Sequence, residues 1–139
     1  MIEGKWYPPG SDISIPLALR RQCLGIGRDE IDNISWQVIV LEGGEPAASG
    51  RIWWQDGDFR IGAIGVLAEH RKKGLGDLVV RILLYKAGEH HAKRVLVQAD
   101  GEAAVFYEKY GFERADEKCA GGMMIWHSDN PMIPPCQRR

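Results

Sequence analysis

A glycine-punctuated basic segment, Arg71-Lys72-Lys73-Gly74-Leu75-Gly76, joins a predicted strand ending at Val66 to a predicted amphipathic helix. The N–H groups in the first turn of a helix lack intrahelical acceptors, and the helix dipole adds a partial positive charge there. Glycines let the backbone turn tightly and approach a ligand, while Arg71, Lys72 and Lys73 supply countercharge. The junction therefore predicts a phosphate-binding site. A helix start behind a solvated basic turn is the plainer alternative.

Two well-known phosphate motifs do not describe this segment. A P-loop requires Gly-Lys-Ser or Gly-Lys-Thr, and neither occurs in the chain. The dinucleotide fingerprint GxGxxG fails as well, because Val79 stands where its third glycine belongs.

A second segment with chemical potential runs from Glu102 to Tyr110 and is predicted to form a helix that ends at Gly111. It carries Tyr107 next to Phe106. A positioned phenol can donate a proton to a leaving group. From the pattern alone, aromatic packing of the two rings is the better explanation.

These segments need a sheet to hold them. β-branched and aromatic runs separated by short polar turns with glycine predict three antiparallel strands in a meander, over 36–41, 47–54 and 59–67. Val95 to Val97 fits a buried strand in parallel pairing, and a last pair of strands is expected at Phe112–Lys118 and Met123–His127. The tail from Asn130, with three prolines, is expected to be loose.

Two further helices are predicted around the sheet. After Pro8-Pro9-Gly10, Ser11 or Asp12 could cap a helix reaching Leu24, with Arg20 and Arg21 among its solvent-facing residues. From Gly74 the apolar residues follow helical spacing, and Gly88 marks the expected end.

The composition predicts one globular domain over residues 1–139. There are 18 Lys and Arg against 19 Asp and Glu, so the net charge of −1 offers no footprint for non-specific nucleic-acid binding. Three cysteines without a CxxC pair argue against a disulfide framework or a zinc ribbon, and no metal site is expected. No stretch reads as a secretory signal or a membrane span, so we expect a cytoplasmic protein without membrane contact.

Both segments together resemble the GCN5-related N-acetyltransferase (GNAT) superfamily. The first matches its acyl-CoA pyrophosphate signature, [QR]xxGx[GA], and Ala103-Ala104-Val105-Phe106-Tyr107-Glu108-Lys109-Tyr110-Gly111-Phe112 resembles its A-x-x-FYEKxGF segment. The order and spacing of the two blocks also match, as in small single-domain bacterial-type members. The resemblance implies a mixed α/β fold: a mostly antiparallel sheet of roughly six to seven strands, splayed between the fourth and fifth and flanked by about four helices.

The resemblance also implies a reaction, namely transfer of an acetyl group from acetyl-CoA to a primary amine by direct attack in a ternary complex. Cofactor contacts would come from Ile64, Gly65 and Val66 at the end of the fourth strand and from Arg71, Lys72, Lys73, Gly74, Leu75 and Gly76. Gly65 would admit the pantetheine backbone and Gly62 would permit a bulge, although both glycines could instead relieve packing. Tyr107 matches the family's proton donor to the departing thiolate.

Other roles stay open at this level. No single general base stands out among Glu30, Asp32, Glu69, Glu102 and His127, and a water relay is equally plausible. Asp29, Glu30 and Asp32 could attract a cationic acceptor, or form a solvated acidic loop. The acceptor is expected to be an amine of a small molecule or peptide, and a homodimer is allowed by the exposed strand edges. The alternatives are a non-catalytic acyl-CoA-binding or regulatory domain on the same scaffold and, less well supported, a helix-rich interaction module.

Overall fold

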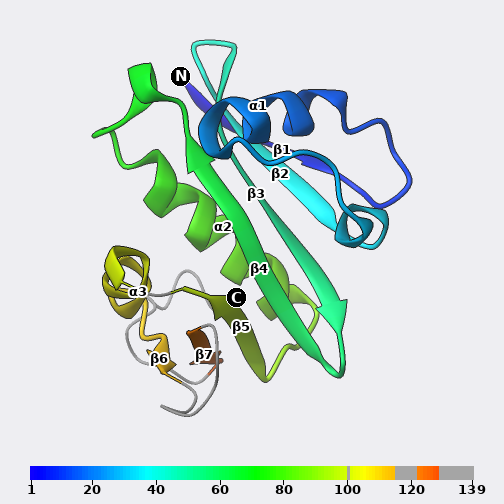
Figure 1. Cartoon of the computed structure of the whole chain (residues 1–139), viewed down its shortest axis with the longest axis vertical. Helices are drawn as coiled ribbons and strands as arrows, with labels where there is room; N and C mark the ends of the chain where they lie inside the picture. The colour runs from blue at the N-terminus through cyan, green and yellow to red at the C-terminus, as the bar shows by residue number, and fades with distance from the viewer. Residues whose placement is uncertain (100, 115–121, 129–139) are drawn as a thin grey trace. The chain divides into compact units, whose positions relative to one another are not determined.

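Seven strands form one mixed sheet in the order β1-β2-β3-β4-β5-β7-β6 (Figure 1). The computed structural model describes residues 1–99, 101–114 and 122–128. The strands are β1 (Ile2–Tyr7), β2 (Trp36–Glu42), β3 (Glu45–Gln55), β4 (Asp58–Val66), β5 (Arg94–Gln98), β6 (Glu113–Arg114) and β7 (Met123–His127). The α-helices are α1 (Ser14–Leu24), α2 (Leu75–Glu89) and α3 (Gly101–Glu108), and two short 3-10 helices are η1 (Glu30–Asn33) and η2 (Ala68–His70).

Contacts divide the chain into two compact units. The first comprises Met1–Trp53 with Gly62–Leu83, and the second comprises Trp54–Ile61 with Leu84–Arg139. Three elements, β3, β4 and α2, therefore continue from one unit into the other.

In the first unit, helices cover both faces of the sheet, and two consecutive residues of β3 show why. A Cβ on Gly50 would lie 2.7 Å from Val79 Cγ1 of α2, so the missing side chain lets α2 pack directly on β3. The next residue, Arg51, points to the opposite face and binds Asp29 and Asp32 at η1. On that face Arg20 of α1 also binds Asp32, which places α1 and α2 on opposite faces (Figure 1).

The strands of the first unit confirm the predicted meander and add an unpredicted strand. β2 pairs with β3 antiparallel, from Trp36 opposite Ile52 to Glu42 opposite Glu45. β1 pairs antiparallel with β2 along its whole length, although the sequence analysis assigned no element there. Its side chains are exposed or half-buried up to Trp6, and only Tyr7 is buried, so β1 shows no hydrophobic alternation.

The prediction that Arg20 faces solvent is wrong. Its side chain is 3% exposed and forms a bidentate pair with Asp32, at 2.9 and 2.6 Å. By contrast two apolar residues of this helix, Ile15 and Leu24, are 47% and 39% exposed. The helix therefore buries a charge through a partner twelve residues away, which periodicity does not reveal.

The second unit contains the predicted parallel pairing. Phe59, Arg60 and Ile61 of β4 pair with Val95, Leu96 and Val97 of β5, and β7 pairs antiparallel with β5 and β6. The remainder of β4 belongs to the first unit, and the predicted splaying of these two strands stays a prediction. Of the expected strand 112–118 the structure describes the short β6, while residues 115–121 and the tail from Asn130 lie outside the described residues.

Helix α2 ends slightly later than predicted. Gly88 lies inside its last turn, and the chain leaves the helix at His91, whose φ of 58° is left-handed. Ala92 N–H donates to Ala87 O and His91 N–H donates to Gly88 O, each at 3.0 Å. This pair of bonds is a Schellman motif with His91 at the position that glycine usually occupies.

Candidate active site

The basic segment forms an irregular loop between η2 and the start of α2 in the first unit. Lys72 and Gly74 have left-handed φ values of 66° and 78°. Leu78 N–H donates to Gly74 O at 3.0 Å, so the first intrahelical bond of α2 starts at Gly74. The N–H groups of residues 75–77 precede this bond and have no acceptor within the helix. The loop therefore brings a helix N-terminus and exposed cations to one place, as anion binding requires.

The three cations of the loop have different surroundings. Arg71 Nε donates to Val66 O at 3.2 Å, which ties the loop to the end of β4. Within residues 1–99, 101–114 and 122–128, the terminal guanidinium nitrogens of Arg71 form no hydrogen bond or ion pair. Lys72 is exposed, and its ammonium has no hydrogen bond or ion pair within the described ranges. Lys73 Nζ lies 2.8 Å from Glu42 Oε1. The sequence alone does not distinguish these three cations.

Glu42, at the end of β2, also contacts His70, with 2.6 Å between His70 Nδ1 and Glu42 Oε1. Hydrogen bonds from Lys73 and His70 hold the pKa of the Glu42 carboxyl below its usual value. Neither Glu42 nor His70 stands out as a site residue in the sequence. No local pattern joins them, because 28 residues separate the two.

The end of β4 explains its glycines differently from the sequence prediction. A Cβ on Gly65 would lie 2.7 Å from Cys23 Cβ, so close packing of α1 already requires this glycine. Gly62 would meet the Trp53 ring at an ordinary 3.5 Å. The left-handed residue of the strand is Ala63, with φ of 53°, and not Gly62. The packing alternative thus accounts for Gly65, and the irregularity in β4 lies one residue after Gly62.

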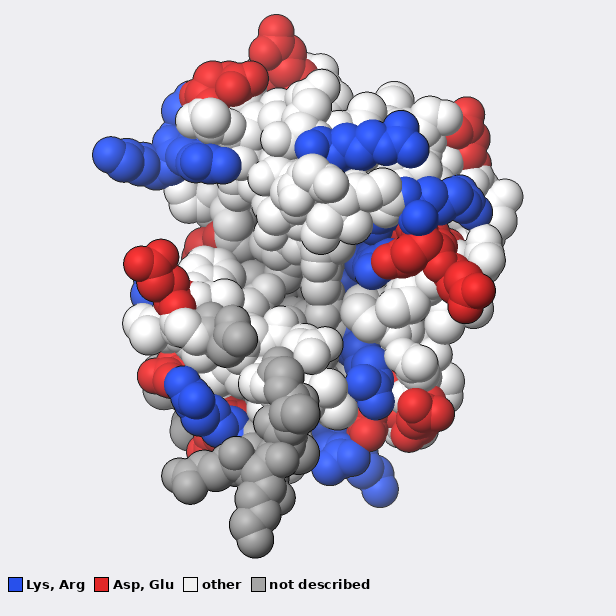
Figure 2. Space-filling model, in the orientation of Figure 1, with Lys and Arg blue, Asp and Glu red and all other residues white. Residues whose placement is uncertain are grey.

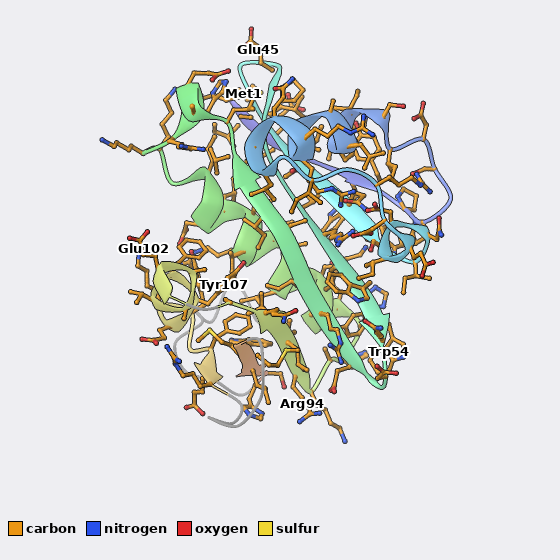
Figure 3. All side chains as sticks on the ribbon, in the orientation of Figure 1. Met1, Glu45, Trp54, Arg94, Glu102 and Tyr107 are labelled. Carbon is orange, nitrogen blue, oxygen red and sulfur yellow. The ribbon has the colours of Figure 1, made fainter. Side chains whose placement is uncertain are left out.

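Tyr107 points from α3 into the interior of the second unit and is 7% exposed (Figure 3). Its ring contacts Phe106 and Phe112, with centroids 5.2 and 5.4 Å away. Burial raises the pKa of Tyr107 to about 12. The phenol therefore stays protonated at neutral pH, as a proton donor must. The ring also packs against Phe106 and Phe112, so the structure is compatible with both the catalytic and the packing role.

A buried charge network in the first unit decides the role of one proposed base. The Asp32 side chain is fully buried and accepts hydrogen bonds from Arg20, Gln37 and Arg51. Burial opposes its ionisation, but the hydrogen bonds from Arg20 and from the Asp29 N–H hold the pKa of Asp32 far below its usual range. Asp32 therefore cannot accept a proton from an amine near neutral pH. Glu30, Glu69, Glu102 and His127 are exposed and stay open as bases.

The same network changes the interpretation of the acidic stretch. Asp29 binds Arg51 through both carboxylate oxygens, at 2.7 and 2.9 Å. Two of the three acidic groups thus neutralise arginines of the protein and only Glu30 projects freely. Neither the predicted cation-attracting surface nor a simple solvated loop describes this stretch.

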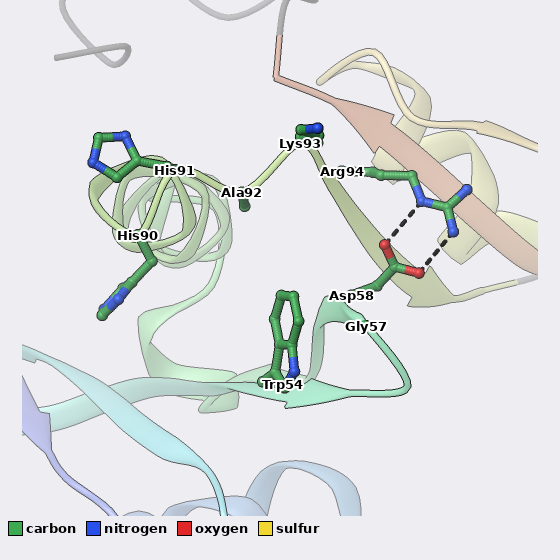
Figure 4. A pocket seen from close by; sticks show the side chains of 8 residues that line it. All are labelled: Trp54, Gly57, Asp58, His90, His91, Ala92, Lys93 and Arg94. Carbon is green, nitrogen blue, oxygen red and sulfur yellow. Dashed lines mark hydrogen bonds and ion pairs between the residues drawn. The ribbon is translucent and has the colours of Figure 1, made fainter.

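The second unit has a cavity of about 330 Å³ between the β3–β4 turn and the end of α2 (Figure 4). Trp54 forms one wall of the cavity, and the ion pair of Asp58 and Arg94 forms another. Arg94 Nε and Nη2 donate to the two carboxylate oxygens of Asp58, at 2.8 and 2.7 Å. The His90 and His91 side chains point away from the opening (Figure 4). Among the described residues no group of three or more His, Cys, Asp or Glu side chains is arranged to hold a metal ion.

Comparison with known proteins links these features to one family. The family model described as "Acetyltransferase (GNAT) domain" matches residues 35–114, which include the basic loop and Tyr107. The uncharacterized N-acetyltransferase YjcF of Bacillus subtilis (strain 168) is 32% identical over 90 residues. That match spans 65% of this chain and 64% of the relative, so it covers less than two thirds of the relative's length.

Solved structures share the fold at low sequence identity. Escherichia coli ElaA has a TM-score of 0.73 at 21% identity, covering 90% of this chain and 97% of that one. A GNAT family acetyltransferase from Elizabethkingia anophelis, solved with acetyl-CoA bound, has a TM-score of 0.71 at 16% identity, and the match covers 89% of this chain and 95% of that one.

Among the described residues, no helix has the length and apolar character needed to cross a membrane.

Proposed function

Because the chain belongs to the acetyltransferase (GNAT) family, we propose that it transfers an acetyl group from acetyl-CoA to a primary amine of a small molecule or peptide. The observation that carries the proposal is the junction of β4, the basic loop and α2. There, left-handed Lys72 and Gly74 turn the chain so that exposed cations and a helix N-terminus meet. The acetyl-CoA bound in the Elizabethkingia anophelis structure supports this choice of cosubstrate.

The donor set of this junction fits the pyrophosphate of acetyl-CoA. We assign cofactor binding to Arg71, Lys72, Lys73 and the backbone of Gly74, Leu75 and Gly76. The terminal nitrogens of Arg71 and the ammonium of Lys72 provide charge, and the N–H groups of the first helical turn provide directed donors. The backbone of Ile64, Gly65 and Val66 would pair with the pantetheine amides as an added strand.

Tyr107 is assigned as the proton donor to the departing thiolate. Its burial keeps the phenol protonated far above neutral pH, so the proton is available throughout the working range. An N–H near Val66 would stabilise the oxyanion that develops on the acetyl carbonyl. The proton of the attacking amine would pass to water or to one of the exposed groups left open above, since Asp32 is fully engaged.

Acetyl-CoA binding and acetyl transfer are tested separately. Calorimetry of the full chain with acetyl-CoA measures binding, and thiol release over a panel of primary amines and amino-terminal peptides measures transfer. Binding together with amine-dependent thiol release supports the proposal. Tight binding without release for any amine would favour a non-catalytic acyl-CoA-binding domain, and no binding would refute both.

A further inference from the structure

Glu42 lies under the basic loop but belongs to a different part of the chain. It ends β2, and its Oε1 atom contacts both His70 Nδ1 and Lys73 Nζ, at 2.6 and 2.8 Å. The Glu42 side chain is 24% exposed and that of His70 is 12% exposed, so their contact is partly shielded from solvent. One carboxylate therefore joins the start and the end of the loop segment 70–73 to the sheet.

A third tie completes the attachment of the loop. Arg71 Nε donates to Val66 O, which fixes the loop to the end of β4. Three of four consecutive side chains, His70, Arg71 and Lys73, are thus held by the protein itself, and Lys72 projects from a left-handed backbone. A carboxylate beside a proposed anion site would by itself repel the anion, so its presence needs another reason.

We propose that Glu42 is a positioning residue for acyl-CoA binding, which holds His70 and Lys73 so that the loop is preformed with Lys72 and the start of α2 presented to the pyrophosphate. This inference rests on the proposed function. It also separates the cations, because Lys73 shapes the loop through Glu42 in addition to contributing charge to the site, whereas Lys72 has only the direct role at the phosphate. A preformed loop binds more tightly, since less conformational freedom is lost on binding.

The test depends on the direction of the affinity change. Glu42→Gln and Glu42→Ala remove a negative charge near the phosphates, so an electrostatic effect alone would tighten acetyl-CoA binding. A positioning role predicts the reverse, a rise in Kd of about threefold to tenfold. Glu45→Gln and Glu45→Ala are matched controls, because Glu45 is exposed three residues further along the same hairpin (Figure 3). We expect these controls to change Kd by less than about twofold.

Two further measurements separate positioning from a general loss of structure. Without cofactor, amide hydrogen exchange over residues 68–74 should accelerate in the Glu42 variants, and exchange in β2 and β3 away from residue 42 should not change. If the amine-dependent transfer is present, KM for acetyl-CoA should rise while kcat at saturation stays within about twofold. Exchange that accelerates throughout the first unit would mean that Glu42 serves stability alone, which would overturn the proposal.

The outcomes also distinguish this inference from the proposed function. If the wild-type chain binds acetyl-CoA and the Glu42 variants bind it equally well or more tightly, the positioning role is wrong and the function stands. If the wild-type chain does not bind acetyl-CoA, the proposed function itself fails.

Discussion

Tyr107 combines two properties that determine what its hydroxyl group can do. It is 7% exposed, and burial raises its pKa to about 12, whereas a solvated tyrosine ionises near pH 10. An acid of this kind keeps its proton throughout the working pH range and gives it up only to a base that forms directly beside it, such as a departing thiolate.

We therefore expect Tyr107→Phe to lower turnover at least about a hundredfold, while Kd for acetyl-CoA changes little, because the hydroxyl acts in the transition state. Thiol release measures turnover and calorimetry measures Kd. Tyr110→Phe is the matched control, since Tyr110 is also buried and lies two residues after the end of the same helix. In the wild type, turnover should not fall through loss of the Tyr107 proton below about pH 10. If Tyr107→Phe turns over as fast as Tyr110→Phe and the wild type, Tyr107 has no role in the mechanism.

Asp32 carries a fully buried charge that pairs with two arginines of the first unit, Arg20 and Arg51. Asp32→Asn leaves the Arg20 guanidinium buried without its counter-charge, which should cost about 3–5 kcal/mol in the free energy of unfolding. Urea unfolding measures this loss. Glu30→Gln is the control, because Glu30 is exposed in the same 3-10 helix. If Asp32→Asn lowers the free energy of unfolding by less than about 1 kcal/mol, the Arg20–Asp32 pair does not stabilise the fold appreciably.

The same pair fixes the direction of a pH dependence. The folded pKa of Asp32 lies below its unfolded value of about 3.9, so its contribution is complete above about pH 4 and disappears as the pH falls further. Wild-type stability should therefore decline more steeply below pH 4 than that of Asp32→Asn.

The secondary-structure elements could be predicted where burial imposes a period. β2, β3, β4, α2, β5, α3 and β7 all follow from apolar runs or helical spacing. β1 could not be predicted in this way, because it joins the sheet through backbone pairing with β2 and buries only Tyr7. Hydrogen bonds between the backbones of two strands do not by themselves impose a pattern of polar and apolar side chains.

The candidate site shows the same division between local and distant causes. The loop Arg71–Gly76 and Tyr107 were identified from contiguous motifs whose roles stay predictions. Glu42 and the Arg20–Asp32 pair were missed because each depends on a partner far away in sequence. Two aspartates of the acidic stretch were misjudged for the same reason: their counter-ions lie on α1 and β3.

The end of α2 offers a test at the level of one element. His91 occupies the left-handed position of a Schellman motif, where a side chain is disfavoured. His91→Gly should therefore raise the free energy of unfolding by about 0.5–1 kcal/mol, and His91→Val should lower it. Thermal and urea unfolding measure both variants. His90→Gly is the control, because His90 precedes the left-handed position and should gain nothing from glycine. Stabilisation by both glycines would contradict the capping argument.

At the level of the whole molecule, the charges nearly cancel, yet the proposed ligand is a multiple anion. The net charge is −1, and on the face drawn in Figure 2 basic and acidic side chains lie interspersed. A net charge near zero provides little long-range attraction for acetyl-CoA, so we expect the attraction to come from the cations of the basic loop. Binding should accordingly depend on where a charge is removed, and total charge should matter little.

Lys72→Met and Lys93→Met make the same change in net charge at two exposed positions, one in the basic loop and the other in the second unit after α2. We expect Lys72→Met to raise Kd for acetyl-CoA about fivefold to tenfold and Lys93→Met to change it less than twofold. Raising the salt concentration from about 0.05 M to about 0.5 M should weaken wild-type binding, because it shortens the screening length from roughly 14 Å to about 4 Å. Lys72→Met should lose part of this salt dependence, and Lys93→Met should retain it. If both variants raise Kd equally, overall charge attracts the ligand, and the assignment of the basic loop to the pyrophosphate is wrong.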